Sequence, residues 1–489
     1  NRLLKEIHKR EMRLVLDLVV NHTSDEHPWF EEARKSRHNP YYNYYHWWPA
    51  EKGEPPLRLS YFDEEGNAWT YNKPTDSYYL HYFSRKQPDL NWENPEVRQE
   101  IFDMMRFWFD KGIDGFRMDS ISLIAKDPSF PLIDSKKYPD IFSFYAKEPR
   151  LHLYLHEMNR QVLSKYDCMS VGEGSAVMVD DVAKFVDPAR EELNMLYHFD
   201  AARIRNTTLP DNPESGIDYS LIALKKMFTE WDKAVDKGWP SIYLGNHDQP
   251  RMVSRFGSDK DEFRALSAKM LITFLLTMRG TPYWFAGDEI GMRNIRFDRI
   301  EDYNDIDTIN RYKKAKAEGK DPQDEQKETG RDNARTPFQW DRSPEAGFTA
   351  GTPWLKVNPD YTWINVADEE KDPTSILNYF KKVVSFRKEN PSLIYGSYHL
   401  LDAENPQSYT FLRKTGADTY LIMLNFSPKA AISTPGIDMS NAHVLLDNYG
   451  DRSHMAPQKD ITLRPFEAIV FQLNHPVYES FIDSLDLLE

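Results

Sequence analysis

Four short segments of the sequence place carboxylates beside histidine, asparagine or arginine, directly where apolar runs end. They are Asp17 with Asn21–His22, Arg117 with Asp119, Glu173, and His247–Asp248. A purely structural strand has no need of such side chains at its end. Catalytic groups of α/β barrels lie at the carboxyl ends of the strands. Four such strand ends therefore predict that these side chains share one active site. Its chemistry would be carried by carboxylates, a guanidinium and imidazoles.

The runs that precede these side chains alternate with helical patterns. We predict buried strands at residues 14–20, 113–118, 169–172, 193–199, 241–245 and 281–285, and helices at 1–9, 94–111, 218–235 and 262–277. The run 14–20 is apolar enough for a strand covered on both faces. One helix start is explicit, because Asn94 can cap the helix that Pro95 and Glu96 open. Alternating strands and helices predict an α/β fold with a parallel sheet, closed as a (β/α)8 barrel.

Two regions interrupt this alternation. Residues 25–92 are rich in tyrosine, tryptophan, proline and charge, and are expected to form a subdomain inserted after a barrel strand. From residue 397 to 473 short strands and turns predict an antiparallel β-domain. The barrel would then comprise 1–24 and 93–396, and 474–489 would be a tail with a short amphipathic helix.

Composition excludes several classes of protein. The 489 residues carry a net charge of −15, which argues against general nucleic-acid binding and against anchoring to anionic lipid. The longest strongly apolar run, 270–278, is far shorter than the about 20 residues that cross a bilayer. A single cysteine, Cys168, excludes a disulfide framework and a cysteine zinc cluster. An acidic chain with 13% aromatic residues suits a protein that handles sugars.

The segments also resemble known motifs. DLVVNH (17–22), GFRMD (115–119), VGE (171–173) and NHD (246–248) resemble, in order, the four signature regions of glycoside hydrolase family 13, the α-amylase superfamily. QPDLNW (87–92), RDNARTPFQWD (331–341) and GTPW (351–354) are similar to stretches of its oligo-1,6-glucosidase and α-glucosidase group. The resemblance covers about residues 1–473. It implies a (β/α)8 TIM barrel whose first two strand–helix units precede Asn1, so that the inserted subdomain follows strand 3.

Members of this family retain the anomeric configuration, which requires two carboxyl groups about 5 Å apart. The resemblance implies that Asp119 is the nucleophile and Glu173 the general acid and base. Asp248 would be a third carboxylate that stabilises the transition state. Arg117 lies two residues before Asp119 on the same strand, so its side chain projects to the same side and would keep Asp119 ionised.

The resemblance assigns further residues to substrate binding. His22 and His247 would donate hydrogen bonds to the same glucose, Arg335 would contact the non-reducing glucose, and Asp17 would support these groups. Ser120 follows the nucleophile at a position where α-1,6 enzymes of the group carry valine, and therefore favours α-1,4 linkages. The site needs no metal and the chemistry no cofactor; a structural Ca²⁺ would belong to the part expected before Asn1.

Two other clusters have competing interpretations. Asp302, Asp305 and Asp307 suggest a calcium loop but lack its spacing and its glycine, which favours a solvated helix start. The aromatic cluster within 41–48 is expected to pack in the inserted subdomain or to stack on sugar rings.

The sequence therefore predicts a retaining exo-α-glucosidase acting on short α-1,4- or α-1,6-linked oligosaccharides. One alternative is a glucosyl-transferring relative such as a sucrose isomerase, although 198–205 (HFDAARIR) does not match the arginine-rich motif of those enzymes. Another is a non-catalytic subunit of the kind that serves amino-acid transporters, but all three carboxylates are present. We expect a small oligosaccharide as partner, no nucleic acid or membrane, a monomer or weak homo-oligomer, and a cytoplasmic location.

Overall fold

The structure is a computed structural model that describes residues 2–62, 66–134, 136–138, 141–320, 323–416, 418–452 and 459–473. The predicted tail at 474–489 lies outside these residues. The chain forms two compact units. The first comprises Asn1–Phe199 with Ala234–Trp239, and the second Asp200–Lys233 with Pro240–Glu489.

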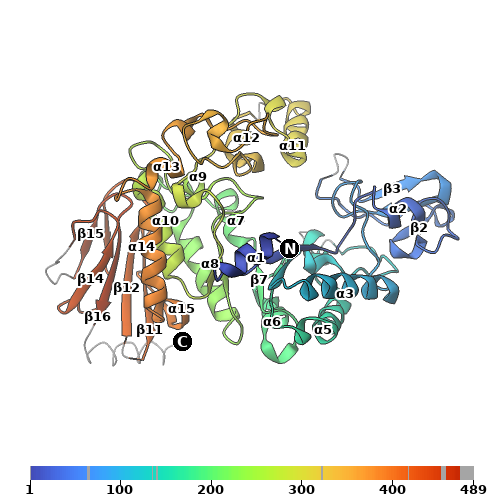
Figure 1. Cartoon of the computed structure of the whole chain (residues 1–489), viewed down its shortest axis with the longest axis horizontal. Coiled ribbons are helices and arrows are strands. Elements are labelled where there is room, and N and C mark those ends of the chain that lie inside the picture. Colours follow the sequence, from blue (N-terminus) through green and yellow to red (C-terminus); the bar gives the residue numbers. More distant parts are fainter. Residues whose placement is uncertain are drawn as a thin grey trace. The chain divides into compact units, whose positions relative to one another are not determined.

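The first unit is built on a four-stranded parallel sheet in the order β1-β5-β6-β7. Its strands are β1 (Val15–Val19), β5 (Gly115–Asp119), β6 (Met169–Glu173) and β7 (Met195–Tyr197). Along the chain, one helix of this unit precedes β1 and others lie between consecutive strands of the sheet, as the alternation predicted (Figure 1). They are α1 (Arg2–Lys9), α3 (Pro95–Asp110), α4 (Ile141–Tyr145), α5 (Arg150–Gln161) and α6 (Ala183–Val186).

Two details of this sheet bear on the sequence predictions. Asn94 caps α3 as expected, because its side-chain oxygen accepts a hydrogen bond from the Glu96 N–H at 2.9 Å. Within the described residues, β1 is not covered on both faces as its apolar run predicts. This strand pairs only with β5 among the described strands, and within it Leu18 is buried whereas Val19 is 44% exposed. An edge strand lacks the second neighbour that a central strand has.

The predicted inserted region contains an antiparallel sheet in the order β2-β4-β3. Its elements are α2 (Pro28–Ala33), β2 (Trp47–Pro49), β3 (Trp69–Asn72) and β4 (Ser77–Leu80). The aromatic cluster packs on itself rather than forming an open platform: the Trp47 ring stacks on Tyr42 at 4.8 Å, and Tyr45 packs edge-on against Phe30 at 5.0 Å. These rings therefore serve the core of this region.

The second unit continues the alternation of strands and helices. Helix α8 (Leu221–Ala234) precedes β8 (Ser241–Ile242), and α10 (Arg264–Thr277) precedes β9 (Thr281–Pro282). The two strands pair in parallel. Among the described residues the parallel strands thus form a four-stranded and a two-stranded sheet, and no closed barrel. Further helices are α7 (Asp200–Thr207), α9 (Met252–Phe256), α11 (Ile306–Ala317), α12 (Gln323–Thr329), α13 (Val366–Glu369), α14 (Ile376–Glu389) and α15 (Ser392–Tyr395).

The predicted C-terminal antiparallel sheet is confirmed, in the order β10-β11-β12-β16-β14. Its strands are β10 (Ser397–Leu401), β11 (Ser408–Thr415), β12 (Asp418–Asn425), β14 (Ala442–Asp447) and β16 (Ala468–Leu473). A second pair, β13 (Ala431–Ser433) and β15 (Ile461–Leu463), was not predicted because three residues are too few to show alternation. Helix α10 packs against β12 and β16, in the part of Figure 1 where α14 also runs beside the sheet.

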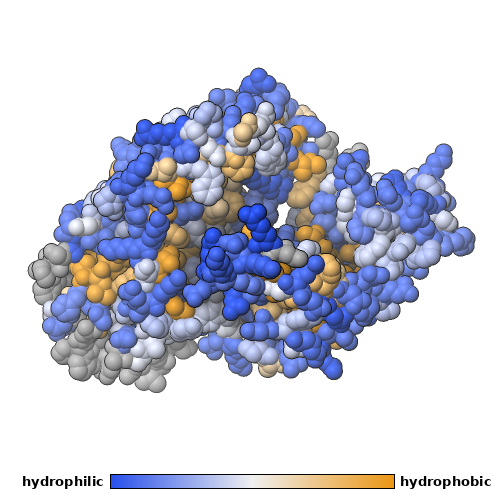
Figure 2. Space-filling model, in the orientation of Figure 1, coloured by the Kyte–Doolittle hydropathy of each residue, from blue (hydrophilic) through white to orange (hydrophobic). Residues whose placement is uncertain are grey.

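The surface is mostly hydrophilic in the view of Figure 2, with a hydrophobic patch over the C-terminal strands. In the described part of the chain, no helix combines the length and the apolar character needed to cross a membrane.

Candidate active site

The two catalytic carboxylates predicted on the first unit lie at the ends of two neighbouring strands. Asp119 is the last residue of β5 and Glu173 the last of β6, and the two strands pair in parallel. Arg117 connects the two groups: its Nη1 donates to Asp119 Oδ1 at 2.7 Å, and its Nη2 donates to Glu173 Oε2. Alternation along β5 directs Arg117 and Asp119 to the same side, so one guanidinium orients both carboxyl groups.

Glu173 is the more enclosed of the two carboxyl groups, with 9% of its side chain exposed against 22% for Asp119. Burial, followed by the charge of Asp119, raises the pKa of Glu173 to about 8. The Arg117 cation and the Ser120 N–H act in the opposite direction without cancelling this effect. Glu173 is therefore protonated at neutral pH, which is the state a general acid requires.

Ser120 follows Asp119 in the left-handed backbone conformation, with a φ of 44°. This turn directs the Ser120 N–H toward Glu173 Oε2, at 3.2 Å, and leaves the residue only 3% exposed. Non-glycine residues seldom adopt such a φ outside constrained sites. The residue that the sequence links to specificity thus contacts the carboxyl group with the raised pKa.

Asp17 lies behind Arg117. Its Oδ1 accepts from Arg117 Nη1 at 2.8 Å, the same nitrogen that donates to Asp119, and 56% of its side chain is exposed. It contacts neither Asp119 nor Glu173 through a described hydrogen bond. Asp17 therefore holds the Arg117 guanidinium, and its supporting role in the site stays a prediction.

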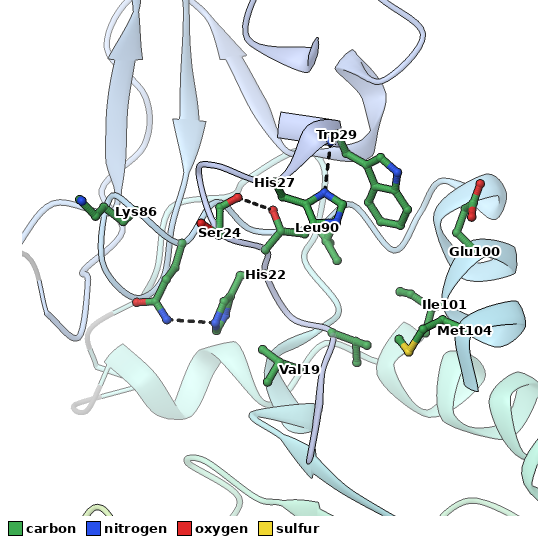
Figure 3. A pocket seen from close by; sticks show the side chains of 13 residues that line it. Val19, His22, Ser24, His27, Trp29, Lys86, Leu90, Glu100, Ile101 and Met104 are labelled. Atoms are coloured by element: carbon green, nitrogen blue, oxygen red, sulfur yellow. Dashed lines mark hydrogen bonds between the residues drawn. The ribbon is translucent and has the colours of Figure 1, made fainter. Parts of the chain in front are cut away.

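His22 is buried on the same unit, after β1. Its Nδ1 lies 3.2 Å from Asn21 Nδ2, and its Nε2 lies 3.0 Å from Gln87 Nε2. His22 and Gln87 line a cavity of about 620 Å³ whose other walls include Val19 and Met104 (Figure 3). Burial lowers the pKa of His22 to about 4, so the imidazole is neutral at neutral pH.

The second unit holds the other predicted residues, His247, Asp248 and Arg335. Asp248 Oδ1 accepts from Arg335 Nη2 at 2.7 Å and from Arg331 Nη1 at 2.9 Å. Arg335 Nε also donates to the His247 carbonyl oxygen at 2.8 Å. His247 Nε2 lies 3.3 Å from Asp248 Oδ2, and its side chain is 53% exposed.

Arg331 has an anchor of its own. Its Nε donates to Asp305 Oδ1 at 2.9 Å, and the Asp305 side chain is fully buried. Two arginines therefore fix one oxygen of Asp248, and one of these arginines is fixed in turn by Asp305.

Residues 1–396 match the family of the α-amylase catalytic domain. The chain belongs to the α-amylase family. The match covers every residue that the sequence assigned to the site, in both units.

Several similar proteins carry the names of glycoside hydrolases. The chain is 49% identical to an oligo-1,6-glucosidase of Parageobacillus thermoglucosidasius over 97% of this chain and 85% of that protein. It is 40% identical to a trehalose-6-phosphate hydrolase of Bacillus subtilis over the same shares. Among solved structures, an isomaltulose synthase mutant of Erwinia rhapontici in complex with sucrose superposes with a TM-score of 0.90 at 40% identity, over 97% of this chain and 85% of that chain.

Several residues around the family motifs were missed by the sequence analysis. Arg331 stands in RDNARTPFQWD, where only the second arginine was singled out, and Lys126 stands in no motif. Asp305 does begin a helix, since it caps α11 by accepting from the Thr308 N–H at 3.1 Å, but it is buried rather than solvated. No group of three or more histidine, cysteine or acidic side chains suited to a metal occurs among the described residues.

Proposed function

We propose that the protein is a retaining exo-α-glucosidase that removes terminal α-linked glucose from short oligosaccharides. The observation that carries the proposal is the pair of carboxyl groups at the ends of β5 and β6, joined by Arg117. Retention requires one ionised and one protonated carboxyl group at close range. The raised pKa of Glu173 supports the protonated partner, and Arg117 places a cation beside the Asp119 carboxyl group.

The reaction takes two displacements. In the first, an Asp119 oxygen attacks the anomeric carbon and forms a glucosyl ester. The bond from that carbon to the glycosidic oxygen breaks, and Glu173 gives its proton to this oxygen so that the rest of the sugar leaves as an alcohol. In the second, the Glu173 carboxylate takes a proton from water as the water oxygen attacks the same carbon and releases Asp119. Glu173 ends protonated and Asp119 ionised, as both began.

The other residues are proposed to bind the same glucose. Asp248 would stabilise the oxocarbenium-like transition state, His22 and His247 would donate to hydroxyl oxygens, and Arg335 would contact the non-reducing glucose. Support for these roles comes from the ordered family motifs. The same motifs support a (β/α)8 barrel that includes β1, β5–β7, β8 and β9.

Two observations bear on the substrate in different ways. The relatives named oligo-1,6-glucosidase favour isomaltose-type α-1,6 linkages, whereas Ser120 beside Glu173 favours α-1,4 linkages. The likeness to isomaltulose synthases supports a second candidate, a sucrose isomerase. In that reaction the glucosyl ester would be attacked by a hydroxyl group of the released fructose instead of water.

We propose a small oligosaccharide as the partner, no cofactor for the chemistry, no nucleic-acid or membrane partner, and a monomer or weak homo-oligomer. The net charge of −15 supports the exclusion of polyanionic partners.

The test is an assay of the purified protein on maltose, isomaltose and sucrose, with Asp119→Asn as the control. Glucose release that disappears in the variant would support the hydrolase, and the preferred disaccharide would give the linkage. Rearranged disaccharide without net glucose would favour the isomerase. Absence of turnover on all three sugars would refute both.

A further inference from the structure

The imidazole of His22 lies between two side-chain amides. Asn21 presents its Nδ2 to His22 Nδ1 at 3.2 Å. Gln87 presents its Nε2 to His22 Nε2 at 3.0 Å, which is the dashed line that ends on His22 in Figure 3. A neutral imidazole carries one N–H, so only one of its nitrogens can accept a hydrogen bond. The two amides therefore compete to decide which nitrogen that is.

Lys126 decides the orientation of the Asn21 amide. Its Nζ donates to Asn21 Oδ1 at 2.6 Å and lies 3.1 Å from an Asp89 carboxylate oxygen, and both charged side chains are fully buried. An ammonium has donors only, so the amide atom facing it must be the oxygen. The NH₂ group then points to Asp89 Oδ1 at 3.3 Å and to His22. The reverse orientation would put NH₂ against the ammonium and the amide oxygen against the carboxylate.

We propose that Lys126 is a positioning residue that, through Asn21, fixes His22 as the tautomer protonated on Nε2. Asn21 Nδ2 donates to His22 Nδ1, so Nδ1 carries no proton and the imidazole proton lies on Nε2. The inference rests on the proposed function in one respect, namely that the Nε2–H of His22 donates to a sugar hydroxyl oxygen.

The opposite amide, Gln87, is held less firmly. Among the described hydrogen bonds, its Oε1 accepts one, from the Ser84 N–H at 3.1 Å, and the residue is half-buried. For the Nε2–H tautomer, Gln87 Nε2 and His22 Nε2 are two donors facing each other. A hydroxyl oxygen has two lone pairs and can accept from both at once. A sugar hydroxyl oxygen that lies beside these two nitrogens, which are 3.0 Å apart, would therefore satisfy both donors.

The burial and the charges around His22 keep its imidazole neutral, so only the two neutral tautomers compete. Burial lowers the pKa of His22 to about 4, Lys126 acts in the same direction, and the Asp119 charge acts in the opposite one. His27, Lys86 and Glu100 line the same cavity. Protonation would place N–H groups against the donors of both amides, which agrees with the lowered pKa.

The experiment is ¹⁵N NMR of the histidine-labelled full chain at pH 7, with the signals of His22 identified by their loss in His22→Gln. We expect an unprotonated Nδ1 and a protonated Nε2 in the parent protein. In Lys126→Met the Asn21 amide is free to turn, and we expect at least a tenth of the population to move to the Nδ1–H tautomer. A parent protein protonated on Nδ1, or an unchanged tautomer in a folded Lys126→Met, would overturn the proposal.

Lys225→Met is the matched control. Lys225 is also fully buried, but its Nζ donates to the backbone oxygens of Asp402, Asn405 and Ser408, in the second unit. Its loss removes a buried ammonium without touching Asn21, so the tautomer of His22 should stay as in the parent. A shift in this control as large as in Lys126→Met would show that the tautomer follows general destabilisation, and would also overturn the proposal.

Asn21→Asp keeps the test decisive if Lys126→Met does not fold. The carboxylate retains the contact with Lys126, whose charge offsets the repulsion between the second carboxylate oxygen and Asp89. It can only accept from His22 Nδ1, so the proton should move to Nδ1. We expect a ten- to hundredfold lower kcat/KM for the glucoside, and a His22 pKa that rises toward neutrality. Retention of the Nε2–H tautomer in Asn21→Asp would refute the proposal. The NMR result does not depend on turnover, so a protein with the expected tautomer and no glucosidase activity would refute the proposed function alone.

Discussion

Asp119 and Glu173 are the last residues of two adjacent parallel strands. The charge of Asp119 is the second-largest cause, behind burial, of the raised pKa of Glu173. The nucleophile and the acid are therefore coupled through their charges as well as through Arg117. Once Asp119 is consumed as an uncharged ester, this contribution disappears and Glu173 gives up its proton more readily. That change is what its second role, as base toward water, requires.

The pH dependence of kcat/KM should show this coupling. Glu173 must be protonated in the free enzyme, and its pKa is raised to about 8, so activity on maltose or isomaltose should fall as the pH rises through 8. An aryl glucoside with a good leaving group needs no proton, and its profile should lack this alkaline limb. A kcat/KM for the disaccharide that stays constant to about pH 9.5 would contradict the assignment.

Substitution of the two carboxyl groups should separate their roles. Glu173→Gln should lower kcat on a disaccharide by about 10²–10⁴-fold and affect an activated aryl glucoside much less in the first step. Azide, which needs no general base, should speed the breakdown of the glucosyl ester and give a glucosyl azide with the retained configuration.

Asp119→Asn should instead abolish turnover on both substrates, by at least about 10³-fold, and azide should not restore it. Equal losses on both substrates for Glu173→Gln, or azide rescue of Asp119→Asn, would reverse or refute the roles. Both variants are isosteric, so unchanged thermal melting would show that the fold is intact.

The sequence could predict the elements that carry a strong pattern. Strands such as β5 and β6 were found because apolar runs end in polar motifs, and α3 because Asn94 caps it. The strands β13 and β15 were not predicted, since three-residue strands carry too little pattern. The enclosure of β1 was overestimated, because an apolar run does not say how many neighbours its strand has.

Within the site, motif residues could be predicted and the residues that hold them could not. Arg117 was found because alternation along one strand fixes its direction. Lys126 and Asp305 lie far in sequence from the groups they hold, and only the folded chain brings them to Asn21 and Arg331. Buried polar contacts between residues distant in the sequence leave no periodic pattern, so they cannot be predicted from the sequence.

Asp305 offers a test of how Asp248 is positioned. Asp305→Asn preserves the helix cap of α11, because asparagine caps as well as aspartate, but removes the charge that anchors Arg331. We expect about a tenfold fall in kcat. The melting temperature should also fall, because Arg331 loses a buried charged partner.

Asp307→Asn is the matched control on the same helix. Asp307 pairs with Arg311 at 3.0 Å and contacts neither Arg331 nor Asp248 through a described hydrogen bond, so activity should be unchanged. Equal effects of the two variants would mean that the charge of α11, and not the contact with Arg331, affects turnover.

Ser120 provides the test of linkage. The backbone N–H of Ser120 donates to Glu173. A larger side chain at this position should therefore contact the aglycone beside the general acid. We expect Ser120→Val to raise the ratio of isomaltose to maltose kcat/KM by about 10–100-fold, as one added hydrophobic contact typically does. Valine is β-branched and strained at a φ of 44°, so the variant should also melt at a lower temperature. Ser120→Ala, which adds no bulk, should leave the ratio within about threefold of the parent. A ratio that is the same in all three proteins would show that linkage preference is set elsewhere in the site.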